Sequence, residues 1–245
     1  MNQGKTTGNG AGADVSYFFE SLLQDLHEWA GRMSRVFESR EGAPGPQELD
    51  AQIHPLVDEF LDRKALPLVG AGFVAAKDAL AGTPWHMAWW QGSTKERLLM
   101  LTVESAGETY SRREWFTVPL ETGEGHITGP YVDFLCTDEY TLTLTVPVTA
   151  NGTIVGVAGA DVLVETIELL LMDRLKDIDP RATLLNGSGR VIVSADPQLA
   201  AGALLVRGWQ GSDAASLPVA DKDLGFDKVA VGRCGTLPLA IAVPA

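Results

Sequence analysis

The sequence of 245 residues contains little cysteine and little histidine, and it lacks any long apolar run. Its two cysteines, Cys136 and Cys234, are too few for a disulfide framework, and they do not have the spacing of a metal site. No stretch approaches the roughly 18 apolar residues of a membrane-spanning helix. The polar, glycine-rich N-terminus has no apolar segment like that of a secretory signal. These absences predict a soluble, cytoplasmic protein, or an extracytoplasmic one if the chain is a fragment of a larger receptor.

Basic side chains are also in the minority. There are 19 Lys and Arg residues against 32 Asp and Glu residues, so the formal net charge is -13. Nucleic acid binding needs a basic face against the phosphates, so this balance argues against nucleic acid as a partner. The charge chiefly describes solubility, and it favours a cationic or zwitterionic small ligand. Hydrophobic residues make up 45% of the chain, which is enough for a core and excludes wholesale disorder.

The N-terminal part has the apolar spacing of a long helix. We expect residues 1–13 to form a flexible tail and Asp14 to cap the helix that follows. Apolar residues then recur at helical spacing as far as Phe37. The broad stripe from Phe18 to Phe37 is either a dimer surface between two copies or a face that packs on the protein's own sheet.

A second helical pattern runs from Leu49 to Leu61, so the sequence predicts N-terminal helices over residues 14–65. Pro55 should kink this second helix or mark its true start. The next segment, residues 66–76, is an apolar run broken by glycines, which we place at a junction between helix and sheet.

From Trp85 onward the pattern changes to that of strands. Strands are expected over residues 85–92, 97–104, 126–135, 141–149 and 153–162, with a short helical segment over 110–118. Asn151-Gly152 stands between two β-rich runs, which is a strong signature of a hairpin with a type I′ turn.

A helix over 164–178 follows, and then a hairpin over 182–195 and short strands near 203–207, 227–233 and 237–243. The sequence therefore predicts an α+β fold with an antiparallel-sheet lobe over 66–163 and a smaller lobe over 164–245.

Most catalytic motifs can be set aside. Gly4-Lys5-Thr6 lacks the preceding strand and upstream glycine of a phosphate-binding loop. Gly70-Ala71-Gly72 with Ala75 resembles a dinucleotide-binding fingerprint, but no long helix or acidic residue follows at the required distance. A nucleotide- or cofactor-dependent enzyme using this glycine loop is kept as the alternative function. The four histidines are scattered and show no metal or catalytic spacing: His27, His54, His86 and His126.

Two segments combine side chains that suit a charged ligand. Residues 110–116 place Arg112 and Arg113 beside Trp115 and Tyr110, and a guanidinium can hold a carboxylate with two parallel hydrogen bonds. In the second segment, Tyr131 and Asp133 share one face of a strand because side chains alternate with period two. A carboxylate and a phenol on one face can receive an ammonium group.

Asp161 ends a nearly all-apolar strand, Gly156 to Asp161. A lone aspartate in this position either caps the next helix, near Val164, or points into a cavity as a further ammonium acceptor.

Together these segments resemble the double Cache sensor domain, the PAS-like ligand-binding module of bacterial receptors. The resemblance runs from about Val15 to Val243 and rests on R-x-W followed by an aromatic residue, on GPYVD, and on a hairpin of the form PVxxNGxxxGVAGAD. A second lobe that opens with a strand, Asn-Gly, Gly-Arg and a strand adds to it. The resemblance implies long N-terminal helices followed by two PAS-like lobes, of which the first binds the ligand.

In amino-acid-binding members of that family, the matching positions bind the two charged ends of the ligand. The resemblance implies Arg113 and Trp115 for the carboxylate, and Tyr131, Asp133 and Asp161 for the α-ammonium.

The chain departs from the family motif at two positions. The family has a tyrosine five residues before the arginine, where this chain has Glu108 and where Tyr110 stands nearby instead. Phe116 lacks a hydroxyl that many members carry. The carboxylate site therefore stays open between Arg113 and Arg112, and an amine remains an alternative ligand.

Family members usually sit between two transmembrane helices and are joined to an output domain, and this sequence contains neither. The resemblance to a ligand-binding module implies a sensor, for which we expect no catalytic residues, metal or cofactor. If the chain is complete, it signals by binding a separate protein.

Overall fold

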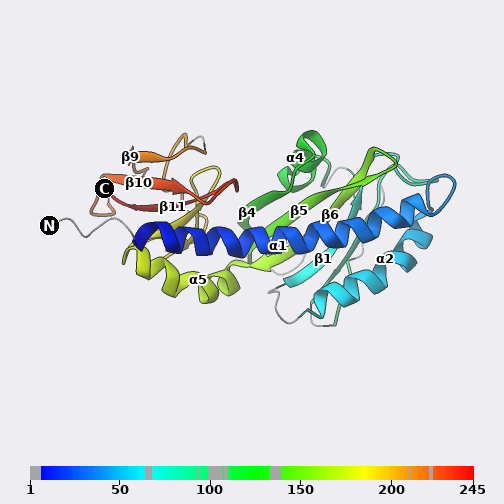
Figure 1. Ribbon diagram of the computed structural model, residues 1–245, viewed down its shortest axis with the longest axis horizontal. Helices are drawn as coiled ribbons and strands as arrows, with labels where there is room; N and C mark the ends of the chain where they lie inside the picture. Colours follow the sequence, from blue (N-terminus) through cyan, green and yellow to red (C-terminus); the bar gives the residue numbers. More distant parts are fainter. Residues whose placement is uncertain are drawn as a thin grey trace. The chain divides into compact units, whose positions relative to one another are not determined.

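A computed structural model describes residues 7–63, 68–92, 94–98, 107, 110–132, 139–209, 211–220 and 223–245. The chain is α+β, as expected, with helices first and two antiparallel sheets after them (Figure 1). It forms two compact units: Leu22–Thr128 with Thr143–Val162, and Met1–Ser21 with Gly129–Leu142 and Leu163–Ala245. We call them the central unit and the terminal unit and describe each by itself. The expected lobe boundaries stay a prediction.

Helix α1 spans Thr7–Glu38 and begins earlier than expected. The prediction of a tail as far as residue 13 is therefore wrong from Thr7 onward, and Asp14 lies inside the helix instead of capping it. A Cβ added to Gly12 would lie 3.9 Å from Ile241 Cδ1, so the helix at Gly12 passes close to the last strand. Such tertiary packing overrides the low helix propensity of glycine.

Helix α2 spans Pro46–Leu61, with Pro46 in its first turn and Pro55 in its interior. Pro55 therefore does not mark the start of this helix. Its missing N–H and its ring are accommodated within the helix.

The apolar stripe of α1 belongs to the protein's own core. Trp29 stacks on Phe60 of α2 with ring centroids 4.6 Å apart, and Phe37 meets Phe73 of the first sheet at 5.6 Å. Both α1 side chains are buried within the single chain. A dimer surface on α1 would have to use the opposite, exposed face of this helix.

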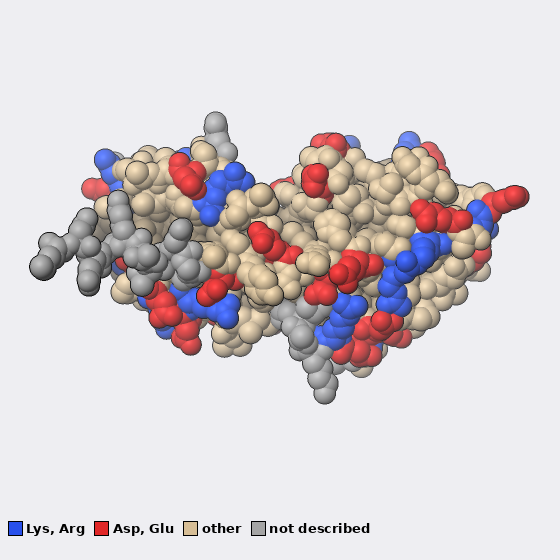
Figure 2. Space-filling view, viewed as in Figure 1, with Lys and Arg blue, Asp and Glu red and all other residues tan. Residues whose placement is uncertain are grey.

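Ion pairs join the polar sides of the helices. Arg32 Nη2 lies 2.6 Å from Glu59 Oε2, and Arg63 Nη1 lies 3.0 Å from Asp25 Oδ1. Figure 2 shows acidic and basic side chains interspersed on the visible face. The net charge of -13 is therefore not gathered there in one uniform acidic field. No helix among the described residues is long and apolar enough to cross a membrane.

The first sheet has six strands in the order β3-β2-β1-β6-β5-β4. The strands are β1 (Leu68–Ala75), β2 (Met87–Gln91), β3 (Glu96–Arg97), β4 (His126–Val132), β5 (Tyr140–Ala150) and β6 (Thr153–Leu163). The turn between β5 and β6 has φ of 50° at Asn151 and 77° at Gly152, as a type I′ hairpin requires, so that prediction is confirmed. The junction that we placed at residues 66–76 is wrong, because β1 is a strand inside the sheet.

Register separates the two faces of this sheet. In antiparallel pairs, directly opposite residues point to the same face. Phe73 and its neighbours face α1 and α2, since Phe73 meets Phe37 and Trp90 stacks on His54 at 5.0 Å. The face that carries Gly70, Gly72 and Val74 is the opposite one.

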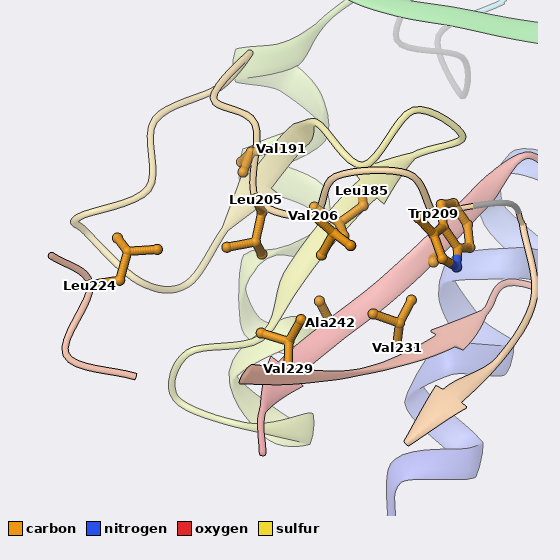
Figure 3. Packing of buried hydrophobic residues seen from close by; sticks show 10 residues of the cluster. Leu185, Val191, Leu205, Val206, Trp209, Leu224, Val229, Val231 and Ala242 are labelled. Atoms are coloured by element: carbon orange, nitrogen blue, oxygen red, sulfur yellow. The ribbon is translucent and has the colours of Figure 1, made fainter. Parts of the chain in front are cut away.

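The second sheet has the order β8-β7-β11-β10-β9. It follows α5 (Val164–Ile178) and consists of β7 (Thr183–Asn186), β8 (Val191–Ser194), β9 (Ala214–Pro218), β10 (Lys228–Arg233) and β11 (Leu239–Pro244). Figure 3 shows Leu185, Val191, Leu205, Val206, Trp209, Leu224, Val229, Val231 and Ala242 in one buried cluster, which also holds Ala240. This cluster gives the terminal unit its own core. The expected strand near 203–207 forms isolated bridges at Leu204 and Val206.

Candidate functional site

The face of the first sheet opposite α1 and α2 contains a row of glycines. Gly72 of β1 pairs with Trp89 of β2 on one side and with Gly159 of β6 on the other. A Cβ on Gly72 would lie 2.8 Å from the Trp89 ring, and a Cβ on Gly159 would lie 2.9 Å from it. The indole therefore lies across both glycines, because neither carries a side chain. We call this side of the sheet the site face.

A helix and the residues before it pack on the site face. Helix α4 spans Glu114–Thr122, so the helical segment expected over 110–118 begins and ends a few residues later. Its aromatic residues join a buried cluster with Trp89, Val74 and Val157 of the sheet. The Thr145 hydroxyl donates to the backbone oxygen of Trp115 at 2.7 Å, which fixes α4 above β5.

Tyr110 forms an inner wall of this cluster. Its side chain is fully buried, and its ring centroid lies 5.0 Å from that of Phe116 and 6.2 Å from that of Trp115. Its hydroxyl donates to the backbone oxygen of His86 at 3.4 Å, and burial raises the pKa of the phenol well above its usual value. The phenol is therefore neutral, bonded within the chain, and placed to support Trp115.

The two arginines lie at the turn that leads into α4. Arg112 and Arg113 are both exposed, and Arg113 is the N-cap residue of the helix. The backbone oxygen of Arg113 accepts the N–H groups of Phe116 and Thr117 at 3.0 and 2.9 Å. This fixes the Arg113 backbone beside the half-buried Trp115.

Asp161 lies on the site face, in β6, and is only 6% exposed. Its Oδ1 accepts a 2.6 Å hydrogen bond from the Thr143 hydroxyl. The N-cap residue of α5 is Leu163, so Asp161 does not cap that helix. The sequence left two roles open for Asp161, a helix cap or an ammonium acceptor. The structure excludes the helix cap and leaves the acceptor role as a prediction.

Tyr131 and Asp133 are described less fully. Tyr131 is a half-buried residue of β4 within the terminal unit, and its position is described in that unit alone. Asp133 lies outside the described residues, as does Glu108. The structure therefore brings Tyr110, Trp115 and Asp161 to one face of the central unit and leaves the roles of Tyr131 and Asp133 as predictions.

The first residue of α4 is held to β4 by an ion pair. His126 Nε2 lies 2.8 Å from Glu114 Oε1. This hydrogen bond holds the pKa of the Glu114 carboxyl below its usual 4.5. The pair ties the helix that carries Trp115 to the edge of the sheet.

Stability from this pair is expected to fade in acid. A carboxyl whose pKa is lower in the folded protein contributes stability above its unfolded pKa and loses it as the pH falls through the folded pKa. The Glu114 side chain is 61% exposed, so Glu114→Gln should cost only ~0.2–1 kcal/mol of unfolding free energy at pH 7. Urea unfolding should show this difference shrinking as the pH is lowered. A constant difference, or an equal effect of the exposed control Glu121→Gln, would contradict the assignment.

A hollow of about 1040 Å³ lies elsewhere, in the terminal unit, between the first turns of α1 and strands β9 to β11. Two charged residues that line it, Asp213 and Arg233, form hydrogen bonds within the chain. Asp213 Oδ1 accepts the Arg233 N–H at 2.7 Å, and Arg233 Nη2 donates to the Thr236 oxygen at 3.4 Å. Six of the predicted site residues are described, and none of these six lines this hollow. The nearby Cys234 is buried, and burial raises the pKa of its thiol to about 12.

The glycine-loop alternative is wrong as a structural motif. Gly70 and Gly72 lie within β1, paired on both sides, and do not form a turn that opens a helix. Among the described residues, no group of three or more His, Cys, Asp or Glu side chains could hold a metal ion.

The sequence analysis missed Trp89, Thr143 and Thr145 as parts of the site face. A signal for the threonines was present in the alternation of Thr141 to Thr145. Thr143 and Thr145 contact Asp161 and the Trp115 backbone on one face of β5, and leucines alternate with them.

One family model matches part of the chain. Residues 81–169 match the model of the first PDC sensor domain of methyl-accepting chemotaxis protein-like proteins. This segment contains α4, β4, β5, β6 and Asp161. The match agrees with the prediction of a sensor module for this segment. No curated protein matches the chain.

Solved structures show the same fold over nearly the whole chain. The ligand-binding domain of the Pseudomonas aeruginosa amino acid chemoreceptor PctC, in complex with GABA, is 16% identical with a TM-score of 0.59, covering 96% of this chain and 95% of that one. The ligand-binding domain of the Pseudomonas fluorescens chemoreceptor CtaA, in complex with L-valine, is 14% identical with a TM-score of 0.60, covering 98% and 94%.

The extracellular domain of mmHK1S-Z3, a protein named for a histidine kinase, is 14% identical with a TM-score of 0.66, covering 97% of this chain and 91% of that one. At these identities the likeness concerns the fold, and it confirms the expected double Cache architecture. The expectation of a cytoplasmic protein finds no support here.

Proposed function

We propose that the chain is a ligand-sensing module that binds an amino acid or a related amine on the site face of its first lobe. The observation that carries this proposal is Asp161, a carboxylate that is 6% exposed on a site face where the other described residues include glycines, threonines, valines and aromatic rings. Its carboxylate accepts the Thr143 hydroxyl within the chain, and it carries the negative charge that attracts an ammonium group with its N–H donors.

Hydrogen-bond donors for the ligand's carboxylate lie at the N-terminus of α4. We assign Arg113 to it, with Trp115 as a flat wall and indole donor, because Arg113 is the residue next to the fixed first turn of the helix. The Tyr110 ring packs beside the Trp115 ring. Tyr131 and Asp133 are assigned to the ammonium end with Asp161, as the family resemblance implies.

We further propose that the module works outside the cytoplasm and passes its signal to a separate signalling protein or region. The related folds support this placement, since they come from chemoreceptors and from an extracellular domain. Ligand binding can drive a response only through different affinities for two arrangements of the protein.

A thermal-shift screen with amino acids, amines and nucleotides tests the proposal. A ligand at ~100 times its Kd should stabilise the protein by about 2.7 kcal/mol. We expect stabilisation by amino acids or amines, and nucleotide-only stabilisation or none at all would contradict the proposal. Arg113→Ala should remove most of the effect of amino acids and spare that of simple amines. Arg112→Ala is the matched control, and the opposite result would transfer the carboxylate to Arg112.

A further inference from the structure

Asp50 of α2 binds two residues at the edge of the first sheet. Its Oδ1 lies 2.7 Å from Nε2 of His86, which precedes β2, and its Oδ2 lies 2.6 Å from Nη2 of Arg97 in β3. All three side chains are half-buried. A carboxylate only accepts hydrogen bonds, so Nε2 of His86 is assigned as the donor. One carboxylate therefore fastens α2 to the chain on both sides of β2.

The residues bonded to Asp50 stand next to residues of the site face. The chain neighbours of His86 and Arg97 that pack against the buried cluster of the site face are Trp85, Met87 and Leu98. This is the alternation of an extended chain, in which successive side chains point to opposite sides. The same short segments therefore carry part of the site-face cluster and its attachment to α2.

His86 also lies against the aromatic wall of the site. Its backbone oxygen accepts the Tyr110 hydroxyl at 3.4 Å. The preceding Trp85 ring meets the Tyr110 ring edge-on, with centroids 5.7 Å apart. Because Tyr110 packs beside Trp115, the segment at His86 connects α2 with the residues that we assign to the ligand.

We propose that Asp50 is a positioning residue for the site face, that it acts through His86, and that α2 is thereby coupled to ligand binding. This inference rests on the proposed function and extends it to a helix on the other side of the sheet. With Asp50 in place, the Trp85, Tyr110 and Trp115 rings are held ready for the ligand. Without it, the ligand must order this wall as it binds, and that ordering costs affinity. The coupling is reciprocal, so a bound ligand also strengthens the attachment of α2.

Calorimetric titration with the most stabilising amino acid or amine of the thermal-shift panel tests the coupling. Asp50→Asn should weaken binding of this probe by ~3- to 10-fold, because an amide offers one acceptor atom to the two donors. Glu59→Gln is the matched control. Glu59 is also a carboxylate of α2 in an ion pair, but its partner is Arg32 of α1, at 2.6 Å, so the probe should bind this variant as it binds the wild type.

Variants of His86 show whether the connection itself matters. His86→Ala removes the donor and should weaken the probe as much as Asp50→Asn does. His86→Gln supplies an amide N–H near the position of Nε2 and should restore most of the affinity. The double variant of Asp50→Asn with His86→Ala should lose no more affinity than either single change, because both break one connection. Losses that multiply would contradict this route.

Hydrogen exchange of the unliganded protein gives a second measurement that needs no ligand. Backbone amides of α4, Glu114–Thr122, should exchange faster in Asp50→Asn than in the wild type, and Glu59→Gln should leave them unchanged. An equal acceleration throughout the central unit would show a loss of stability alone and would overturn the inference.

The outcomes separate this inference from the function beneath it. If the wild-type protein binds the probe and Asp50→Asn binds it equally well, the inference is overturned and the proposed function stands. If no amino acid or amine binds the wild-type protein, the proposed function is overturned and the coupling to a ligand falls with it. Melting temperatures of the unliganded variants establish that each is folded, and the conservative His86→Gln keeps the test decisive if His86→Ala does not fold.

Discussion

Replacing Asp161 by alanine is expected to abolish stabilisation of the protein by every amino acid or amine that stabilises the wild type. The carboxylate is buried on the site face, and removing one member of a buried ionic contact costs about 3–5 kcal/mol. Affinity should therefore fall by at least ~100-fold in calorimetry. The fold should survive, because losing the hydrogen bond from the Thr143 hydroxyl costs only ~1–3 kcal/mol.

Asp161→Asn separates the charge from the hydrogen bond. Its amide oxygen can still accept from the Thr143 hydroxyl, so stability should remain close to that of the wild type. Binding should nevertheless fall by ~10-fold or more, since hydrogen bonds to a charged acceptor are about twice as strong as neutral ones. Unchanged affinity in this variant would exclude Asp161 as the ammonium acceptor.

Gly72→Ala is expected to destabilise the protein by about 3 kcal/mol or more, even though it adds one methyl group. The new Cβ would lie 2.2 Å from the backbone oxygen of Ala88 and 2.7 Å from the Trp89 Cα. Main-chain atoms cannot rotate aside, so the strands must separate or the Trp89 ring must leave the glycine row. Thermal unfolding should show a loss of roughly 6–12 °C.

Gly31→Ala is the matched control for that change. Gly31 lies on the exposed side of α1, and a Cβ there would meet nothing within 4 Å. Because alanine is the better helix former, this variant should gain ~0.5–1 kcal/mol. Equal effects of the two substitutions would show that the glycine row does not define the site face.

The hairpin of β5 and β6 was predictable because local chemistry determines it. Asn-Gly adopts the positive φ values of a type I′ turn, and the alternation of threonine and leucine assigns the two faces of β5. Asp161 was found for the same reason, since a single acid at the end of an apolar strand is conspicuous.

Strand β1 was not predictable from local pattern. Its glycines lower the strand propensity of the segment. They are needed because the Trp89 ring of β2 lies across Gly72 and leaves no room for a side chain there. The start of α1 was missed likewise, because Gly12 is helical through packing on Ile241. Contacts between distant segments determine these features.

The central claim is that a small ligand binds on the site face of the first lobe through its ammonium group. An electron-density map of the protein crystallised with the most stabilising amino acid or amine tests it most directly. The account predicts ligand density above Gly70, with the ammonium nitrogen at hydrogen-bond distance from the Asp161 carboxylate. Density confined to the hollow between α1 and strands β9 to β11, or a site face without ligand at saturating concentration, would contradict it.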